Sequence, residues 1–181
     1  MELGRLVAAL PGKKGVTYTF ERGKIAQHAH SALHHDVVRA TDTMRAWGVR
    51  RGMRVGIYAP NSYHWMVHDL ALIELGAISM PFTDDFADKV DDALLDKYNI
   101  ALLLISRRDA RLFPQKPAHV AFLDADNDGI KVLDRPPNDD PDEDDQHSLV
   151  FSSGSAGGLK GLVISRKAWR SPCRPSSKPS A

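Results

Sequence analysis

The sequence predicts an α/β protein with a mostly parallel sheet and flanking helices. Three observations predict this fold class. Apolar segments of strand length alternate with segments in which apolar residues recur at helical spacing. Residues 100–106 (IALLLIS) form a continuous apolar run, as in parallel strands that are covered on both faces. Helices of this length between strands indicate right-handed βαβ crossovers, which place the strands in one parallel sheet.

The composition predicts one cytoplasmic domain without a membrane span. The chain has 181 residues, of which 43% are hydrophobic, enough for a single domain with a sizeable core. A formal net charge of +1 gives no reason to expect a nucleic acid or an anionic membrane as a partner. The single cysteine, Cys173, cannot form an internal disulfide, which fits a reducing cytosol. No apolar run approaches the ~18 residues that a membrane-spanning helix needs.

The N-terminal part predicts a strand and then a long helix. Residues 16–20 alternate apolar and polar side chains, which is typical of a half-buried strand. From residue 21 to residue 47 apolar side chains recur at helical spacing, and Gly48 is a suitable C-terminal stop. The apolar positions of this predicted helix are Ile25, Ala29, Ala32, Leu33, Val37, Ala40, Met44 and Trp47.

A strand, a helix and another strand follow. Residues 54–59 (RVGIYA) predict a buried strand. Ser62 is a suitable N-cap for a helix over residues 63–75, and Gly76 is a suitable residue to end it. Residues 77–82 predict the next strand.

The middle of the chain predicts shorter elements. We expect an amphipathic helix over residues 86–98, before the apolar strand at 100–106. Residues 120–123 and 130–133 predict two short strands, with a turn over residues 124–129 between them.

The C-terminal part predicts a loop, two strands and a disordered tail. The Pro- and Asp-rich stretch 135–146 is typical of a solvated loop. A strand at 148–151 leads into a Gly/Ser-rich segment, and a strand at 162–165 follows it. Residues 170–181 contain three prolines and no apolar periodicity, so we expect them to be disordered.

The Gly/Ser-rich segment is the main candidate for chemistry. It reads VFSSGSAGGLKG over residues 150–161. Glycines let several backbone N–H groups turn toward one anion, serine hydroxyls add donors, and lysine adds a positive charge, so this composition suits a polyphosphate. A Walker A loop is excluded, because Leu159 and Gly161 stand where that motif needs Gly and Ser or Thr. A flexible turn between two strands has the same composition, so composition alone leaves both interpretations open.

The order of residues in this segment resembles the phosphate-loop motif of the adenylate-forming superfamily. That superfamily includes acyl-CoA synthetases, nonribosomal peptide synthetase adenylation domains and firefly luciferase, and its motif reads approximately [FY]-T-S-G-[ST]-T-G-x-P-K-G. The matching residues are Phe151, Ser153, Gly154, Ser155, Gly157, Lys160 and Gly161. Ser152 is a conservative replacement, whereas Ala156 and Leu159 stand where a hydroxyl residue and a proline are usual.

The upstream sequence supports the same resemblance. Val16-Thr17-Tyr18 matches the Thr-Tyr strand that precedes a long helix in the family. The segment 48–57 is similar to G-V-x-x-G-D-x-V-x-I, with Met53 in the aspartate position. Pro60-Asn61-Ser62 and the G-A-x-x-x-P pattern at residues 76–81 follow in the family's order. The resemblance covers roughly residues 16–169.

The resemblance implies a fold, a reaction and a set of site residues. It implies that residues 1–169 are the N-terminal part of an AMP-binding domain with the layered αβαβα fold. In the family, a carboxylic acid attacks ATP, assisted by Mg²⁺, and the thiol of CoA or of a carrier protein captures the acyl-adenylate; some members serve fatty acid metabolism. The residues implied to bind phosphate here are Ser152, Ser153, Gly154, Ser155, Gly157, Lys160 and Gly161.

Other parts of the family pattern are not found in this sequence. The adenine and acyl pockets and the C-terminal domain with the catalytic lysine follow the phosphate loop in the family. We therefore expect an incomplete chain whose tail, residues 170–181, arose by truncation or frameshift. Two alternatives stay open: a non-catalytic nucleotide-binding or interaction module, and a degraded remnant with exposed apolar patches.

Three weaker patterns favour structural roles. His64 and His68 have the i, i+4 spacing of helical metal ligands but lack the glutamate of H-E-x-x-H. Residues 124–129 imitate the start of a calcium loop, but Arg135 stands where the bidentate glutamate belongs, so an exposed turn is expected. A histidine cluster on the predicted long helix favours a solvated face; its members are His28, His30, His34 and His35.

Overall fold

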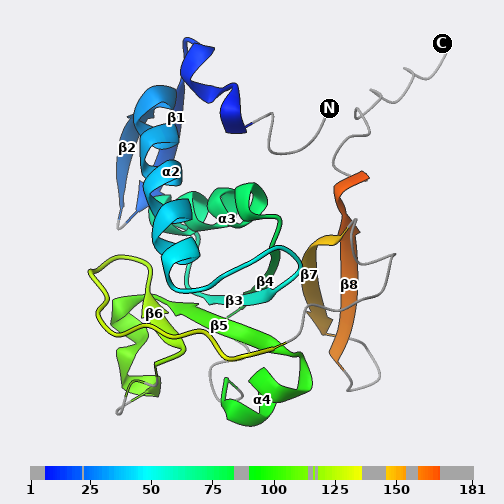
Figure 1. The fold of residues 1–181 in the computed structure, drawn as a ribbon. Coiled ribbons are helices and arrows are strands. Elements are labelled where there is room, and N and C mark those ends of the chain that lie inside the picture. Colours follow the sequence, from blue (N-terminus) through cyan, green and yellow to red (C-terminus); the bar gives the residue numbers. More distant parts are fainter. Residues whose placement is uncertain are drawn as a thin grey trace, which may run out of the picture.

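A six-stranded sheet forms the centre of the protein, with strand order β6-β5-β3-β4-β7-β8 (Figure 1). The computed structural model describes residues 7–21, 23–83, 90–113, 116, 118–135, 146–153 and 159–167, with only the backbone of 152, 153, 159 and 160. The strands of this sheet are β3 (Arg54–Tyr58), β4 (Ile78–Phe82), β5 (Ile100–Ile105), β6 (Val120–Phe122), β7 (Gln146–Ser153) and β8 (Leu159–Ser165). All pairs are parallel except β7–β8, so the predicted fold class is confirmed.

Helices cover both faces of this sheet. The helices α2 (His30–Ala46) and α3 (Tyr63–Leu75) lie on one side, and the short helix α4 (Asp92–Lys97) lies on the other (Figure 1). Alternate residues of β5 enter two different cores: Leu102 and Leu104 pack with α2 and α3, whereas Leu103 and Ile105 pack with α4. This burial on both faces explains the continuous apolar run in the sequence.

The ends of α3 confirm both predicted caps. The Ser62 hydroxyl accepts a hydrogen bond from the Trp65 backbone N–H at 3.1 Å. Gly76 follows the last turn with φ +69°, in the left-handed region that favours glycine. These local signals fix the helix between β3 and β4, and therefore the parallel pairing of those strands.

The long helix begins later than the sequence predicts, and residues 24–29 are a strand instead. This strand, β2 (Lys24–Ala29), pairs antiparallel with β1 (Val16–Glu21) in a separate two-stranded sheet. Gly23, with φ +77°, lies in the turn between them. The helical spacing of Ile25 and Ala29 was misleading, because both side chains belong to the outward face of a hairpin.

Two other predicted elements differ from the structure. The predicted helix at 86–98 is helical only over Asp92–Lys97, after the N-cap Asp91; residues 84–89 lie outside the described part. Residues 130–133 are not a regular strand, although the N–H groups of Lys131 and Leu133 donate to the carbonyl groups of Ala118 and Ala101. Of the predicted loop at 135–146, residues 136–145 lie outside the described residues and Gln146 already belongs to β7; the predicted disordered tail also lies outside them.

A short 3₁₀ helix, η1 (Leu10–Gly12), precedes the hairpin, and a second one, η3 (Arg107–Leu112), follows β5.

The β1–β2 hairpin lies beside α2, away from the central sheet (Figure 1). Its outward face exposes four large apolar side chains: Val16, Tyr18, Phe20 and Ile25.

Candidate functional site

The β7–β8 hairpin carries the predicted phosphate-binding residues. Its last cross-strand pairs are Ser152 with Lys160 and Ser153 with Leu159, so the hairpin brings the backbones of Ser152 and Lys160 together. Gly161 pairs with Phe151 one step further along. Gly154, Ser155 and Gly157 lie outside the described residues, so their predicted role remains a prediction.

The topology gives this hairpin a definite position on the sheet. β7 runs parallel to β4, through the pair of Ser79 with Ser148, and β4 runs parallel to β3. Ser153, the last residue of β7, therefore lies at the carboxyl edge of the parallel strands. In open α/β sheets, ligands bind outside this edge.

An aromatic cluster fastens β7 near its carboxyl end. The Phe151 ring stacks on Phe82 with centroids 5.3 Å apart, and it meets Tyr98 edge-on with centroids 4.8 Å apart. These contacts join β7 to β4 and to the end of α4. Phe151 is the aromatic residue of the matched motif, so its ring has a packing role in this chain.

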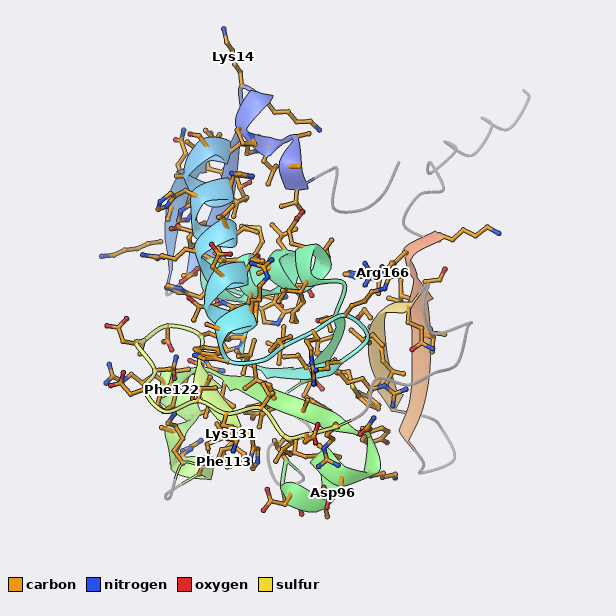
Figure 2. The ribbon with its side chains drawn as sticks, viewed as in Figure 1. Lys14, Asp96, Phe113, Phe122, Lys131 and Arg166 are labelled. Carbon is orange, nitrogen blue, oxygen red and sulfur yellow. The ribbon has the colours of Figure 1, made fainter. Side chains whose placement is uncertain are left out.

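Two hydrogen bonds fasten the opposite end of the hairpin, which we call its base. The Arg166 guanidinium donates from Nε to the Gln146 carbonyl oxygen at 3.1 Å and from Nη2 to the Ala77 carbonyl oxygen at 3.3 Å. Figure 2 shows this side chain extending from the end of β8 toward the rest of the sheet. Arg166 therefore ties both strands of the hairpin to the residue that precedes β4.

The same base buries polar side chains that the sequence analysis did not single out. His147 on β7 is 2% exposed and Ser79 on β4 is 1% exposed. Burial raises the pKa of Asp69 on α3, while the Ser79 hydroxyl and the His147 charge oppose that rise. Burial likewise lowers the pKa of His147, which Asp69 opposes and the positive charge of Arg166 reinforces. One feature of the sequence could have pointed to this site: His147 stands within the strand sequence QHSLVF, next to apolar residues.

Two cavities lie on the side of the sheet formed by β3, β5 and β6. One of about 690 Å³ lies between α2, α3 and the turn after β6, and Asp36, His64, His68 and Asp124 are among its lining residues. A second of about 280 Å³ lies where β3 and β5 end, and Ser62 and Ser106 contribute to its lining. Both cavities are separate from the β7–β8 hairpin.

The weaker sequence patterns have structural explanations. The His68 Nδ1–H donates to the His64 carbonyl oxygen at 2.8 Å, and burial lowers the His68 pKa to about 4. No group of three His, Cys, Asp or Glu side chains within the described ranges is placed to hold a metal ion. Asp124 accepts the Arg107 backbone N–H at 2.9 Å, which links the turn after β6 to the start of η3. His28 lies on β2, not on the long helix as predicted.

No helix in the described part of the chain has the length and apolar character to cross a membrane.

Comparison with known proteins identifies related sequences. The family model described as AMP-binding enzyme matches residues 7–177. A linear gramicidin synthase from Brevibacillus parabrevis is 23% identical over 163 residues, which are 90% of this chain and 3% of that protein. Crotonobetaine/carnitine–CoA ligase of Shigella sonnei (strain Ss046) is 21% identical in an alignment of 161 residues that covers 78% of this chain and 31% of that protein. This chain therefore spans less than a third of either relative.

Solved structures have a similar fold. The inhibitor-bound N-terminal domain of FACL13 from Mycobacterium tuberculosis gives a TM-score of 0.65 at 16% identity, over 91% of this chain and 44% of that chain. O-succinylbenzoate coenzyme A synthetase from Bacillus subtilis, in complex with AMP, gives a TM-score of 0.63 at 16% identity, over 90% of this chain and 42% of that chain. At this level of identity the similarity concerns the fold.

Proposed function

The chain belongs to the AMP-binding enzyme family, and on this premise we propose that residues 152–161 bind the β- and γ-phosphates of ATP. The observation that carries the proposal is the cross-strand pairing of Ser152 with Lys160 at the carboxyl edge of the sheet. This pairing places two residues of the matched motif on adjacent strands, and the segment between them supplies three glycines and two further serines. Glycine-rich segments of this kind present several N–H groups to one anion.

Each residue of the motif has a proposed role. Hydroxyl groups of Ser152, Ser153 and Ser155 donate hydrogen bonds to phosphate oxygens. Lys160 supplies a positive charge that offsets the charge of the pyrophosphate leaving group, and it binds rather than acting as an acid or base. Gly154, Gly157 and Gly161 let the backbone approach the phosphates closely.

Mg²⁺ enters this proposal as the partner of the ATP phosphates. The oxygen-rich composition of the loop fits this hard cation, because Mg²⁺ in nucleotide sites keeps several waters and binds phosphates with few protein ligands. Hydroxyl groups of Ser152, Ser153 and Ser155 are the candidate protein ligands. When bound, the ion neutralises charge on the phosphate oxygens.

For the complete protein we propose carboxylate adenylation followed by thioester formation. Family enzymes act on ATP, a carboxylic acid, and the thiol of CoA or of a carrier protein. An acyl-CoA ligase is the favoured form, because the relatives include a carnitine–CoA ligase and an acetyl-coenzyme A synthetase. Residues 1–169 would then contribute the N-terminal part of the adenylation domain, in the cytoplasm.

Thermal melting with and without Mg-ATP tests the phosphate loop. Ligand at about 100 times its dissociation constant stabilises a protein by about 2.7 kcal/mol, which raises Tm by several degrees. We expect this shift for the unmodified chain and its loss in Lys160→Ala. Lys131→Ala is the matched control, because it removes one positive charge from an exposed site away from β7–β8 (Figure 2). Equal shifts in all three proteins would contradict the proposal.

A second candidate is a non-catalytic nucleotide-binding or interaction module. The observation that favours it is the outward apolar face of the β1–β2 hairpin, on which Phe20 and Ile25 are each 72% exposed. Large exposed apolar side chains that lie together are typical of interaction surfaces. Carboxylate-dependent exchange of pyrophosphate into ATP by the complete protein separates the two candidates: an adenylating enzyme catalyses it, and a binding module with an intact ATP-dependent melting shift does not.

A further inference from the structure

The base of the β7–β8 hairpin contains a β-bulge at His147. Gln146 pairs with Ser165 and Ser148 pairs with Ile164, so β7 has one more residue than β8 over this step. A bulge interrupts the alternation of side chains and redirects the extra residue, and bulges are common next to functional sites. Without the bulge, His147 would share the face of Leu149 and Phe151, which pack with the α4 core.

The bulge instead buries His147 in a polar environment. Ser79, the cross-strand partner of Ser148, is buried as deeply as His147. The Asp69 carboxyl group on α3 lies near His147 and the Ser79 hydroxyl group, and both oppose the rise that burial causes in its pKa. Three elements that are distant in the sequence therefore each place one polar side chain here: α3, β4 and β7.

Arg166 completes this arrangement from the end of β8. Its guanidinium spans from the Gln146 carbonyl group to the Ala77 carbonyl group, and its charge reaches His147. The planar guanidinium group of arginine can donate to two acceptors at once in a fixed geometry, whereas a lysine ammonium group has no such fixed geometry. The four side chains that meet at the base, here called the polar clamp, are Asp69, Ser79, His147 and Arg166.

We propose that the polar clamp is a positioning device that fixes the β7–β8 hairpin against α3 and β4 and thereby holds the phosphate loop in its binding geometry. This inference rests on the proposed function, since it assigns a role to residues that do not touch ATP. Within the described residues, the pair of Ser79 with Ser148 joins β4 and β7 at the base, and the Phe82–Phe151 stack joins them nearer the carboxyl end. At the base, the two hydrogen bonds of Arg166 are directional contacts, and such contacts fix the angle of the hairpin more sharply than apolar packing does.

The burial of polar groups supports a positioning role over a general contribution to stability. Burying a polar or ionisable side chain costs solvation free energy, so an apolar cluster would stabilise this position at least as well. Removing one member, in contrast, leaves the other buried without its partner and disturbs the local structure. The clamp should therefore affect the hairpin more than the remainder of the sheet.

Amide hydrogen exchange on Asp69→Asn and His147→Gln tests the clamp directly. We expect the amides of β7 and β8 to exchange about tenfold faster in either variant, while those of β3 and β5 keep their rates. Thr41→Val is the matched control: it removes a buried hydroxyl group that donates to the Val37 carbonyl group within α2. The control should leave β7 and β8 unchanged. Unchanged β7–β8 exchange, or equal acceleration of every strand, would overturn the proposal.

A double variant tests whether Asp69 and His147 act as a pair. If they interact, Asp69→Asn with His147→Gln should accelerate β7–β8 exchange by less than the product of the two single effects. Effects that multiply fully would show two independent contributions and would overturn the paired arrangement.

Titration with Mg-ATP links the clamp to the loop. At a temperature where every variant is folded, we expect ATP affinity to fall about tenfold in Asp69→Asn and His147→Gln, and to stay unchanged in Thr41→Val. Unchanged affinity alongside a loosened hairpin would overturn the positioning role. If the unmodified chain and Lys160→Ala both fail to bind ATP, the proposed function is wrong, and the exchange measurement still decides whether the clamp fixes the hairpin.

Discussion

The imidazole ring of His28 stacks on the phenol ring of Tyr63, with centroids 3.8 Å apart and planes inclined by 13°. The Tyr63 hydroxyl group donates to Asp36 Oδ2 at 2.7 Å, and its backbone N–H donates to Glu21 Oε1 at 2.6 Å. Tyr63 thus joins the β1–β2 hairpin, α2 and the first turn of α3. These contacts use the polar face of the hairpin, so its apolar face is left pointing outward.

Replacing Tyr63 separates the stacking contact from the hydrogen bond. Tyr63→Phe keeps the ring on His28 but leaves Asp36 without this donor, and we expect the free energy of unfolding to fall by about 1 kcal/mol. Tyr63→Ala also loses the ring and should cost about 3 kcal/mol. Denaturant titration measures both values. Equal losses would mean that the ring contributes nothing beyond its hydroxyl group.

We predict that the packing around Gly56, in the centre of β3, leaves no room for a methyl group. A Cβ atom at this position would lie 2.9 Å from Leu103 Cδ1 and 3.0 Å from Phe82 Cε2. Both neighbours are buried in the α4 core, so Gly56→Ala should lower the free energy of unfolding by about 1–3 kcal/mol. Gly12→Ala is the control, because no atom lies within 4 Å of its added Cβ. A neutral Gly56→Ala would show that the core relaxes easily.

The burial of His68 predicts a pH dependence of stability. Its pKa is lowered from 6.5 to about 4, so the unfolded chain takes up a proton at a higher pH than the folded one. The stability contribution is therefore complete above pH 6.5 and is lost as the pH falls from about 6.5 to about 4, by up to about 3 kcal/mol. His68→Gln should reduce the slope of unfolding free energy against pH in this window. An unchanged slope would assign the pH dependence to other groups.

The outward face of the hairpin can be made polar without loss of stability. Phe20 is 72% exposed, and its partner across the hairpin, Ile25, is equally exposed. Phe20→Thr keeps a residue with high strand propensity and should change the free energy of unfolding by less than about 0.5 kcal/mol. It should also reduce binding of a hydrophobic dye and self-association in light scattering. A large loss of stability would mean that Phe20 packs against the protein in solution.

The sequence by itself determined the elements whose signals are local. Ser62 and Gly76 fix the two ends of α3 through contacts within a few residues, and both caps are present. The apolar run at 100–106 required a strand buried on both faces, and β5 is such a strand. The motif at 150–161 likewise identified the family from residue order alone, although the geometry of Gly154, Ser155 and Gly157 stays a prediction.

Only the tertiary structure decided how distant segments pair. Residues 24–29 have apolar spacing that fits a helix, yet pairing with β1 makes them a strand, because backbone hydrogen bonds to another segment outweigh a weak local preference. The polar clamp was equally invisible in the sequence. Asp69 and His147 acquire their shifted pKa values from burial and from each other, and both effects exist only after α3 and β7 have packed on the same sheet.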